Sequence, residues 1–202
     1  MAEIYNQVFY YTERQIDKIL KSGNEGSRKA NLANLRKGVG YAPGEIPELW
    51  GIFLQNMPEE FYSPSGKPSF AEWAVYTALT LFALHQQGHD PVKDPMSKSD
   101  VPFGSAVARL VHSDDEKERV LRRFNTVATS TDITEVSYHL RTLIQLLRGE
   151  GIPLDYPALA KDLYFYQNTE FSPSVRLRWG QDFYRELNKK YNTNNGEEEN
   201  HD

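Results

Sequence analysis

Residues 69–87, SFAEWAVYTALTLFALHQQ, place the strongest constraint on the fold of this chain. Ser69 followed three residues later by Glu72 is the pattern of a capping box, in which each side chain bonds the backbone N–H of the other residue at the start of a helix. The helix that follows is apolar on nearly every side, so it has no face suited to water. We therefore predict a central helix that other helices surround.

The rest of the chain also shows helical periodicity, and no run alternates apolar and polar residues over the length of a strand. Further helices are predicted over residues 2–21, 26–37, 47–56, 103–112, 115–129, 132–149, 155–166 and 173–191. Ser27 and Asp155 are the expected N-caps of two of them. The sequence thus predicts an all-α fold of about eight or nine helices, arranged as two packed bundles.

Residues 88–102, GHDPVKDPMSKSDVP, contain three prolines and no apolar period, which is typical of a loop. We predict that residues 91–102 connect an N-terminal helical bundle, 1–90, to a C-terminal helical bundle, 103–191. Residues 192–202 are polar and acidic and have no apolar anchor, so a disordered acidic tail is predicted there.

The composition removes several classes of site. The chain has no cysteine, so disulfide bonds, cysteine-based zinc sites and thiol nucleophiles are excluded. The first residues, MAEIYNQVFYYTER, lack the basic segment and apolar run of a signal peptide. The most apolar stretch is too short to span a bilayer. We expect a cytoplasmic protein with no membrane partner.

The formal net charge of −5 overstates the acidity of the folded part. Glu197, Glu198, Glu199 and Asp202 lie in the predicted tail. The 28 acidic residues less these four leave 24, against 23 lysines and arginines. A basic surface is therefore possible if the charges are segregated, because the local field and not the total charge attracts a ligand.

The stretch RVLRRFNTV, residues 119–127, separates apolar from basic residues. At 100° per residue its apolar side chains cluster on one side of a helix, while Arg119, Arg122 and Arg123 point roughly opposite. Like charges at i, i+4 repel one another by a few tenths of a kcal/mol. The arginines form either a solvated face or a site for a negative ligand.

Basic residues recur on several other predicted helices. An arginine side chain forms a fork that matches phosphate, and binding to a nucleic-acid backbone requires such bases without catalytic groups. The predicted nucleic-acid-binding residues are Arg28, Lys29, Arg36, Lys37, Arg109, Arg119, Arg122, Arg123, Arg141 and Arg148.

His85, His89 and Asp90 give the clearest alternative, an enzyme. Two histidines four residues apart can bind a metal on one helix face, and a His-Asp pair is typical of helical metal-dependent phosphohydrolases. Gly88 lies between the histidines and is expected to end the helix, so the two rings need not share a face. We predict no metal site and no cofactor, and keep the phosphohydrolase as an alternative.

Two further groups of residues admit a chemical interpretation. Asp155 and Asp162 could place two carboxylates together on a helix, as in some catalytic sites. A simpler interpretation is that Asp155 is the N-cap of the helix and that Asp162 is an exposed charge. The aromatic residues between 164 and 184 could stack on bases, although residues at helical spacing usually belong to the core or to a partner interface.

The order of several segments resembles the CasB family, the small subunits of type I-E CRISPR surveillance complexes (Cascade). The basic segment GSRKANLANLRKG comes first. It is followed by LFALHQQGHD, PFGSAVARL, ERVLRRFNTV, HLRTLIQLLRGEGIPLDYPALAKDL and VRLRWGQDFY. The resemblance extends from about residue 26 to residue 185.

The resemblance implies a non-catalytic protein of two helical bundles that acts in antiviral defence. Two copies would pack head to tail within the complex, together with its repeated backbone subunit and its large subunit. They would contact the heteroduplex of guide RNA and target DNA and the displaced non-target strand, and stabilise the R-loop.

By position, Arg36 and Lys37 match the first basic pair of the family, and Arg141 matches its HLR segment. A helical protein–protein adaptor, whose arginines bind an acidic partner, is the second alternative.

Overall fold

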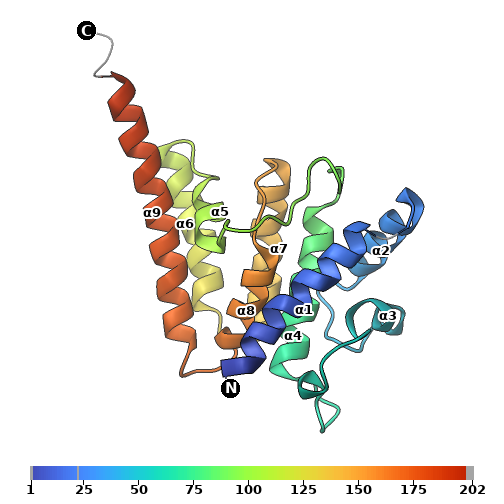
Figure 1. Ribbon diagram of the computed structural model, residues 1–202. Coiled ribbons are helices and arrows are strands. Elements are labelled where there is room, and N and C mark those ends of the chain that lie inside the picture. Colours follow the sequence, from blue (N-terminus) through green and yellow to red (C-terminus); the bar gives the residue numbers. More distant parts are fainter. Residues whose placement is uncertain (1, 22, 199–202) are drawn as a thin grey trace.

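A computed structural model describes residues 2–21 and 23–198 (Figure 1). Within these residues the chain forms nine α-helices and two short 3₁₀ helices, which confirms the predicted all-α class. The helices are α1 Ala2–Lys21, α2 Glu25–Lys37, η1 Pro47–Leu49, α3 Trp50–Phe53, η2 Glu59–Phe61, α4 Phe70–His85, α5 Phe103–Ala108, α6 Asp114–Thr129, α7 Ile133–Gly149, α8 Tyr156–Tyr166 and α9 Ser172–Glu198. None of the described helices is long and apolar enough to span a membrane.

Helix α4 lies at the centre of the fold, as predicted. The Ser69 hydroxyl accepts a hydrogen bond from Glu72 N at 3.1 Å, and the Glu72 carboxylate accepts one from Ser69 N at 2.7 Å. Every residue from Ala74 to His85 is buried, because α1, α2, α7 and α8 all pack against the helix (Figure 1). The apolar character of α4 thus fixes the positions of four other helices.

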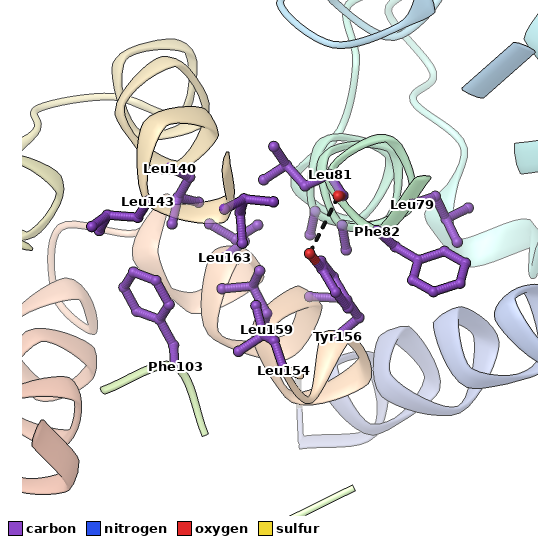
Figure 2. Close-up of a cluster of buried hydrophobic side chains, with 14 of the residues drawn as sticks. Leu79, Leu81, Phe82, Phe103, Leu140, Leu143, Leu154, Tyr156, Leu159 and Leu163 are labelled. Atoms are coloured by element: carbon purple, nitrogen blue, oxygen red, sulfur yellow. Dashed lines mark hydrogen bonds between the residues drawn. The ribbon is translucent and has the colours of Figure 1, made fainter. Parts of the chain in front are cut away.

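The core is continuous across the chain. Helix α8, from the second half of the sequence, packs against both α1 and α4. Figure 2 shows Leu159 and Leu163 of α8 beside leucines of α4 and α7, and the Tyr156 hydroxyl donates to Leu81 O at 3.2 Å. Residues on both sides of the 91–102 connection therefore share one core, and the division into two bundles there stays a prediction.

Helix α5 approaches α9 closely at Gly104. A Cβ atom at this position would overlap the carbonyl oxygen of Trp179 and lie 2.8 Å from Phe183 N. Only glycine lets the two backbones come so near. The close approach matters for the second half of the fold because it joins α5, which is buried along its whole length, to α9, the longest of the described helices.

Several element boundaries differ from the sequence-based expectation. Asn24, and not Ser27, caps α2, because the Asn24 side chain accepts a hydrogen bond from Ser27 N at 2.9 Å. The helix expected over 47–56 ends at Phe53, before the left-handed Asn56 and Pro58. Helix α9 extends to Glu198 and so includes part of the predicted tail, since no proline follows Pro173 to stop it. Residues 199–202 of that tail lie outside the described residues.

The prediction that Asp162 is an exposed charge is wrong. Its carboxylate accepts hydrogen bonds from Trp179 Nε1 at 2.6 Å and from Arg178 at 2.5 Å, and only 15% of the side chain is exposed. Burial raises the pKa of Asp162, an effect that the charge of Arg178 opposes. This carboxylate therefore joins α8 to α9 and has a structural role.

We predict that Gly104→Ala destabilises the protein, because the added methyl group must push α5 away from the α9 backbone. Overpacking of this kind costs about 1–3 kcal/mol or more. Gly180→Ala on α9 is the matched control, because a Cβ there meets no atom within 4 Å. This control is expected to stabilise the helix by about 0.5–1 kcal/mol. Urea unfolding of both variants measures the difference, and equal stabilities would contradict the close approach.

Candidate functional site

The first basic surface is the exposed side of α6. Ser113 caps the helix, accepting a hydrogen bond from Glu116 N at 3.3 Å, and Val120, Phe124 and Val127 are buried. Arg119, Arg122 and Arg123 are all exposed on the other side, as predicted. Folding of α6 does not require them, because its apolar residues already supply the buried side.

The α6 arginines differ in their contacts. Arg119 lies 3.9 Å from the carboxylate of Glu116, which is at the outer limit of an ion pair. Arg123 donates to the carbonyl oxygen of Arg119 at 3.4 Å. Within the described part of the chain, neither Arg122 nor Arg123 forms an ion pair with an acid. Two of the three cations are thus available to a ligand.

The second basic surface is a groove of about 700 Å³ between α2 and the segment that follows α4. One wall is α2 from Glu25 to Arg36, and the other is residues 86–93. We call it the basic groove, because Arg28, Lys29 and Arg36 line it from α2 and Lys93 lines it from the opposite wall. Helices α2 and α4 pack directly against each other, which fixes the position of the groove (Figure 1).

Arg148, from α7, lies close to this groove. Its guanidinium donates to the Gln87 side-chain oxygen at 3.0 Å. Partial burial lowers the pKa of Arg36, and the nearby positive charge of Arg148 lowers it further. The fold therefore brings together Arg28, Lys29, Arg36 and Arg148, which the sequence places on two distant helices.

Gln86 holds the second wall of the groove. Its amide nitrogen donates to His89 O at 3.2 Å and to Asp94 O at 3.1 Å, and its oxygen accepts from Met96 N at 2.8 Å. The side chain is buried, with 2% exposure. One glutamine thus satisfies three main-chain groups of a loop that has no regular secondary structure.

The two histidines have separate roles. His85 is fully buried, its Nδ1 lies 2.9 Å from the Tyr156 hydroxyl, and burial lowers its pKa to about 4. His89 Nε2 lies 2.9 Å from Arg148 O and its Nδ1 lies 2.6 Å from the Asp94 carboxylate. The bond to the Arg148 carbonyl is the main reason that the pKa of His89 is raised, although desolvation opposes it.

These contacts bear on the phosphohydrolase alternative. Both ring nitrogens of His89 already bond oxygen atoms of the protein, so neither has a lone pair for a metal. Helix α4 ends at His85, and Gly88 adopts a left-handed conformation, so the two rings do not share a helix face. Within the described residues, no three histidines or acids form a cluster suited to a metal ion.

The remaining predicted binding residues lie outside the groove. Arg109 Nε donates to Glu186 at 2.7 Å and so connects α5 to α9. Lys37 and Arg141 are exposed. Their roles in binding stay predictions. Sequence reasoning did not identify Lys93, Gln86 or Gln87 as part of a site, and the only signal near them was the HQQGHD segment, which suggested catalysis.

Comparison with known proteins identifies relatives. A model of the family described as CRISPR-associated protein Cse2 matches residues 31–184. The crystal structure of CasB from Thermobifida fusca is similar over 88% of this chain and 97% of that chain, with a TM-score of 0.72 and 29% identity. A search of curated proteins found no match.

More distant solved structures share the fold. The crystal structure of M. ruber CasB has a TM-score of 0.66 and 21% identity, and covers 91% of this chain and 97% of that chain. A structure described as a CRISPR RNA-guided surveillance complex contains a chain with a TM-score of 0.68 and 21% identity, over 94% of this chain and 98% of that chain.

We predict that Gln86→Leu destabilises the protein and loosens residues 88–96. The substitution leaves three main-chain groups without their partner, and each such buried group costs about 1–3 kcal/mol. Gln87→Leu is the control, because Gln87 is exposed and bonds only an arginine side chain. Its effect is expected to stay within about 0.5 kcal/mol. Amide hydrogen exchange at Met96, measured beside urea unfolding, tests the expectation. Unchanged protection of that amide in Gln86→Leu would contradict it.

Proposed function

The chain belongs to the family of the CRISPR-associated protein Cse2, the CasB family, and from this we propose that it is a nucleic-acid-binding subunit of a type I-E CRISPR Cascade complex. In that complex it has a structural and not a catalytic role. It contacts the heteroduplex of guide RNA and target DNA and the displaced non-target strand. These contacts stabilise the R-loop.

The observation that carries the proposal is the exposed arginine face of α6. Arg119, Arg122 and Arg123 contribute nothing to the core, and their mutual repulsion costs some helix stability. A negative ligand along the helix would offset that cost. The phosphates of a nucleic-acid backbone fit this requirement, because arginine binds them through paired hydrogen bonds and charge, without reading the base sequence.

Such contacts are sufficient for a role in R-loop formation. A heteroduplex of RNA and DNA is about as stable as the DNA duplex that it replaces, so the exchange is nearly balanced. Contacts with the backbones of the separated strands can therefore tip the equilibrium. A surface of arginines achieves this without metal ions or catalytic groups.

The proposal extends to the protein partners. In the complex the protein would contact the repeated backbone subunit and the large subunit. It would also contact a second copy of this chain, packed head to tail. The similarity to a chain within a surveillance complex supports this assignment, because the two share one fold over 94% of this chain.

We predict that the triple variant Arg122→Glu, Arg123→Glu and Arg141→Glu weakens the R-loop of the reconstituted complex and folds normally, because all three side chains are exposed. Binding of an RNA–DNA heteroduplex should fall about tenfold to a hundredfold at low salt. The slope of log K against log salt should become shallower, by about 0.9 for each phosphate that the variant no longer binds. Filter binding and R-loop lifetime measure these effects.

The matched control reverses three exposed bases elsewhere, Arg14, Lys67 and Lys98, and so changes the net charge equally. This control should bind like the wild type. An R-loop as stable in the first variant as in the control would overturn the proposal for α6 and α7. Dissociation of a protein subunit from the complex, with heteroduplex binding unchanged, would favour the adaptor instead.

A further inference from the structure

We propose that His89, the Asp94 carboxylate and the main-chain carbonyl of Arg148 form a proton-dependent latch. With two protons on its imidazole ring, His89 bonds both oxygen atoms and holds the segment after α4, residues 86–96, against the end of α7. Loss of one proton breaks one bond and loosens the segment. We call this set of groups the histidine latch. The inference goes beyond the proposed function and does not depend on it, because it concerns contacts within this chain alone.

The two contacts of His89 require a doubly protonated ring. Its Nδ1 lies 2.6 Å from the Asp94 carboxylate, and its Nε2 lies 2.9 Å from the carbonyl oxygen of Arg148. Both oxygen atoms are acceptors, whereas a neutral imidazole has one N–H donor and one lone pair. The bonded arrangement therefore requires the imidazolium, in which both nitrogens donate. Its charge also suits its position, because the carbonyl dipoles at the end of a helix favour a cation.

The turn that ends α7 lies directly against the His89 ring. Arg148 O accepts a second hydrogen bond from Gly151 N at 3.2 Å, so both of its lone pairs are used. Gly151 has a φ angle of +62°, and a Cβ atom at this position would lie 3.7 Å from Cε1 of His89. The latch thus connects two parts of the chain that are 59 residues apart in sequence.

The segment is fastened at both ends by groups that do not titrate near neutral pH. The Gln86 side chain bonds its main chain to the end of α4. At the far end, Leu154 N donates to Met96 O at 3.0 Å and Lys98 N donates to Leu154 O at 3.1 Å. His89 lies between these ends and contacts α7. Loss of the latch is therefore expected to increase local opening of residues 88–95 without unfolding the helices.

Charged groups from several elements act on His89. The hydrogen bond to Arg148 O is the main reason that the pKa of His89 is raised, and the bond to Asp94 and its charge act in the same direction. Burial and the positive charge of Arg148 oppose this change. His85 of α4 is also near, but burial lowers its pKa to about 4, so it stays neutral at neutral pH. The other charged groups around His89 are Asp90 and Lys93 on its own segment and Glu25, Arg28, Lys29 and Arg36 on α2.

The direction of the pH dependence follows from the raised pKa. The latch contributes its full stability below the pKa of histidine in the unfolded chain, which is about 6.5. That contribution is lost as the pH rises through the higher pKa of His89 in the folded protein. Residues 86–93 form one wall of the basic groove, so this wall is held against α7 at low pH and is released at high pH.

We predict that the Asp94 amide, which donates to Asp90 O at 2.8 Å, loses protection from hydrogen exchange as the pH rises. The protection factor, which corrects for the intrinsic pH dependence of exchange, should fall about threefold to tenfold between about pH 6 and pH 9, as expected for the loss of one hydrogen bond. NMR of the His89 ring should show protons on both nitrogens at the lower pH. A ring with a single proton there would overturn the inference.

Two variants distinguish the latch from a histidine that is merely packed in place. His89→Gln has no titrating ring, so residue 94 should show the low protection of the high-pH wild type at both pH values. Asp94→Asn should have the opposite effect. The asparagine amide can donate to Nδ1 of a neutral ring while Nε2 still donates to Arg148 O, so both bonds persist without the second proton. Protection should then stay within about twofold of the low-pH wild type at both pH values.

His112→Gln is the matched control. His112 Nε2 lies 2.7 Å from the Glu150 carboxylate at the same end of α7, but the residue belongs to the connection between α5 and α6. This variant should keep the full pH dependence at the Asp94 amide. The same pH dependence in His89→Gln or in Asp94→Asn as in the wild type would overturn the latch. Low protection of Asp94→Asn at both pH values would also overturn it, because the carboxylate and not the second ring proton would then hold the segment.

Discussion

The burial of α4 is the constraint on which the rest of the structure depends. This helix has no polar face, so α1, α2, α7 and α8 must cover it, and their arrangement follows from that requirement. The end of α4 therefore reaches the surface at a fixed place, beside α2. Gln86 and His89 follow directly, and the groove lies where the core ends. The position of a polar, charged site is thus a consequence of apolar packing.

The sequence predicts those features that depend on neighbours along the chain. The capping box at Ser69 and the amphipathic α6 are both local patterns, and the structure confirms them. The sequence could not predict that Arg36 lies near Arg148, because this proximity requires α2 and α7 to pack around the same end of α4. Asp162 was misjudged for the same reason, since its partners Arg178 and Trp179 lie on another helix.

The two basic surfaces differ physically although both carry arginine side chains. On α6 the side chains are solvated, so their attraction for phosphate is weak at each contact and is screened by salt. In the groove the guanidinium groups are partly enclosed, so less water competes with a ligand for them. A ligand bound on α6 would therefore be more sensitive to salt than a ligand bound in the groove.

Gln86 and His89 bond mainly to main-chain atoms, namely the carbonyl oxygens of His89, Asp94 and Arg148 and the amide of Met96. Every residue type except proline offers the same main-chain N–H and C=O groups. The path of the loop therefore depends little on the side chains at positions 92 and 93, whereas Pro91 restricts the backbone by its ring. Substitution of the exposed Val92 or Lys93 would therefore change the charge and polarity of the groove while the backbone keeps its path.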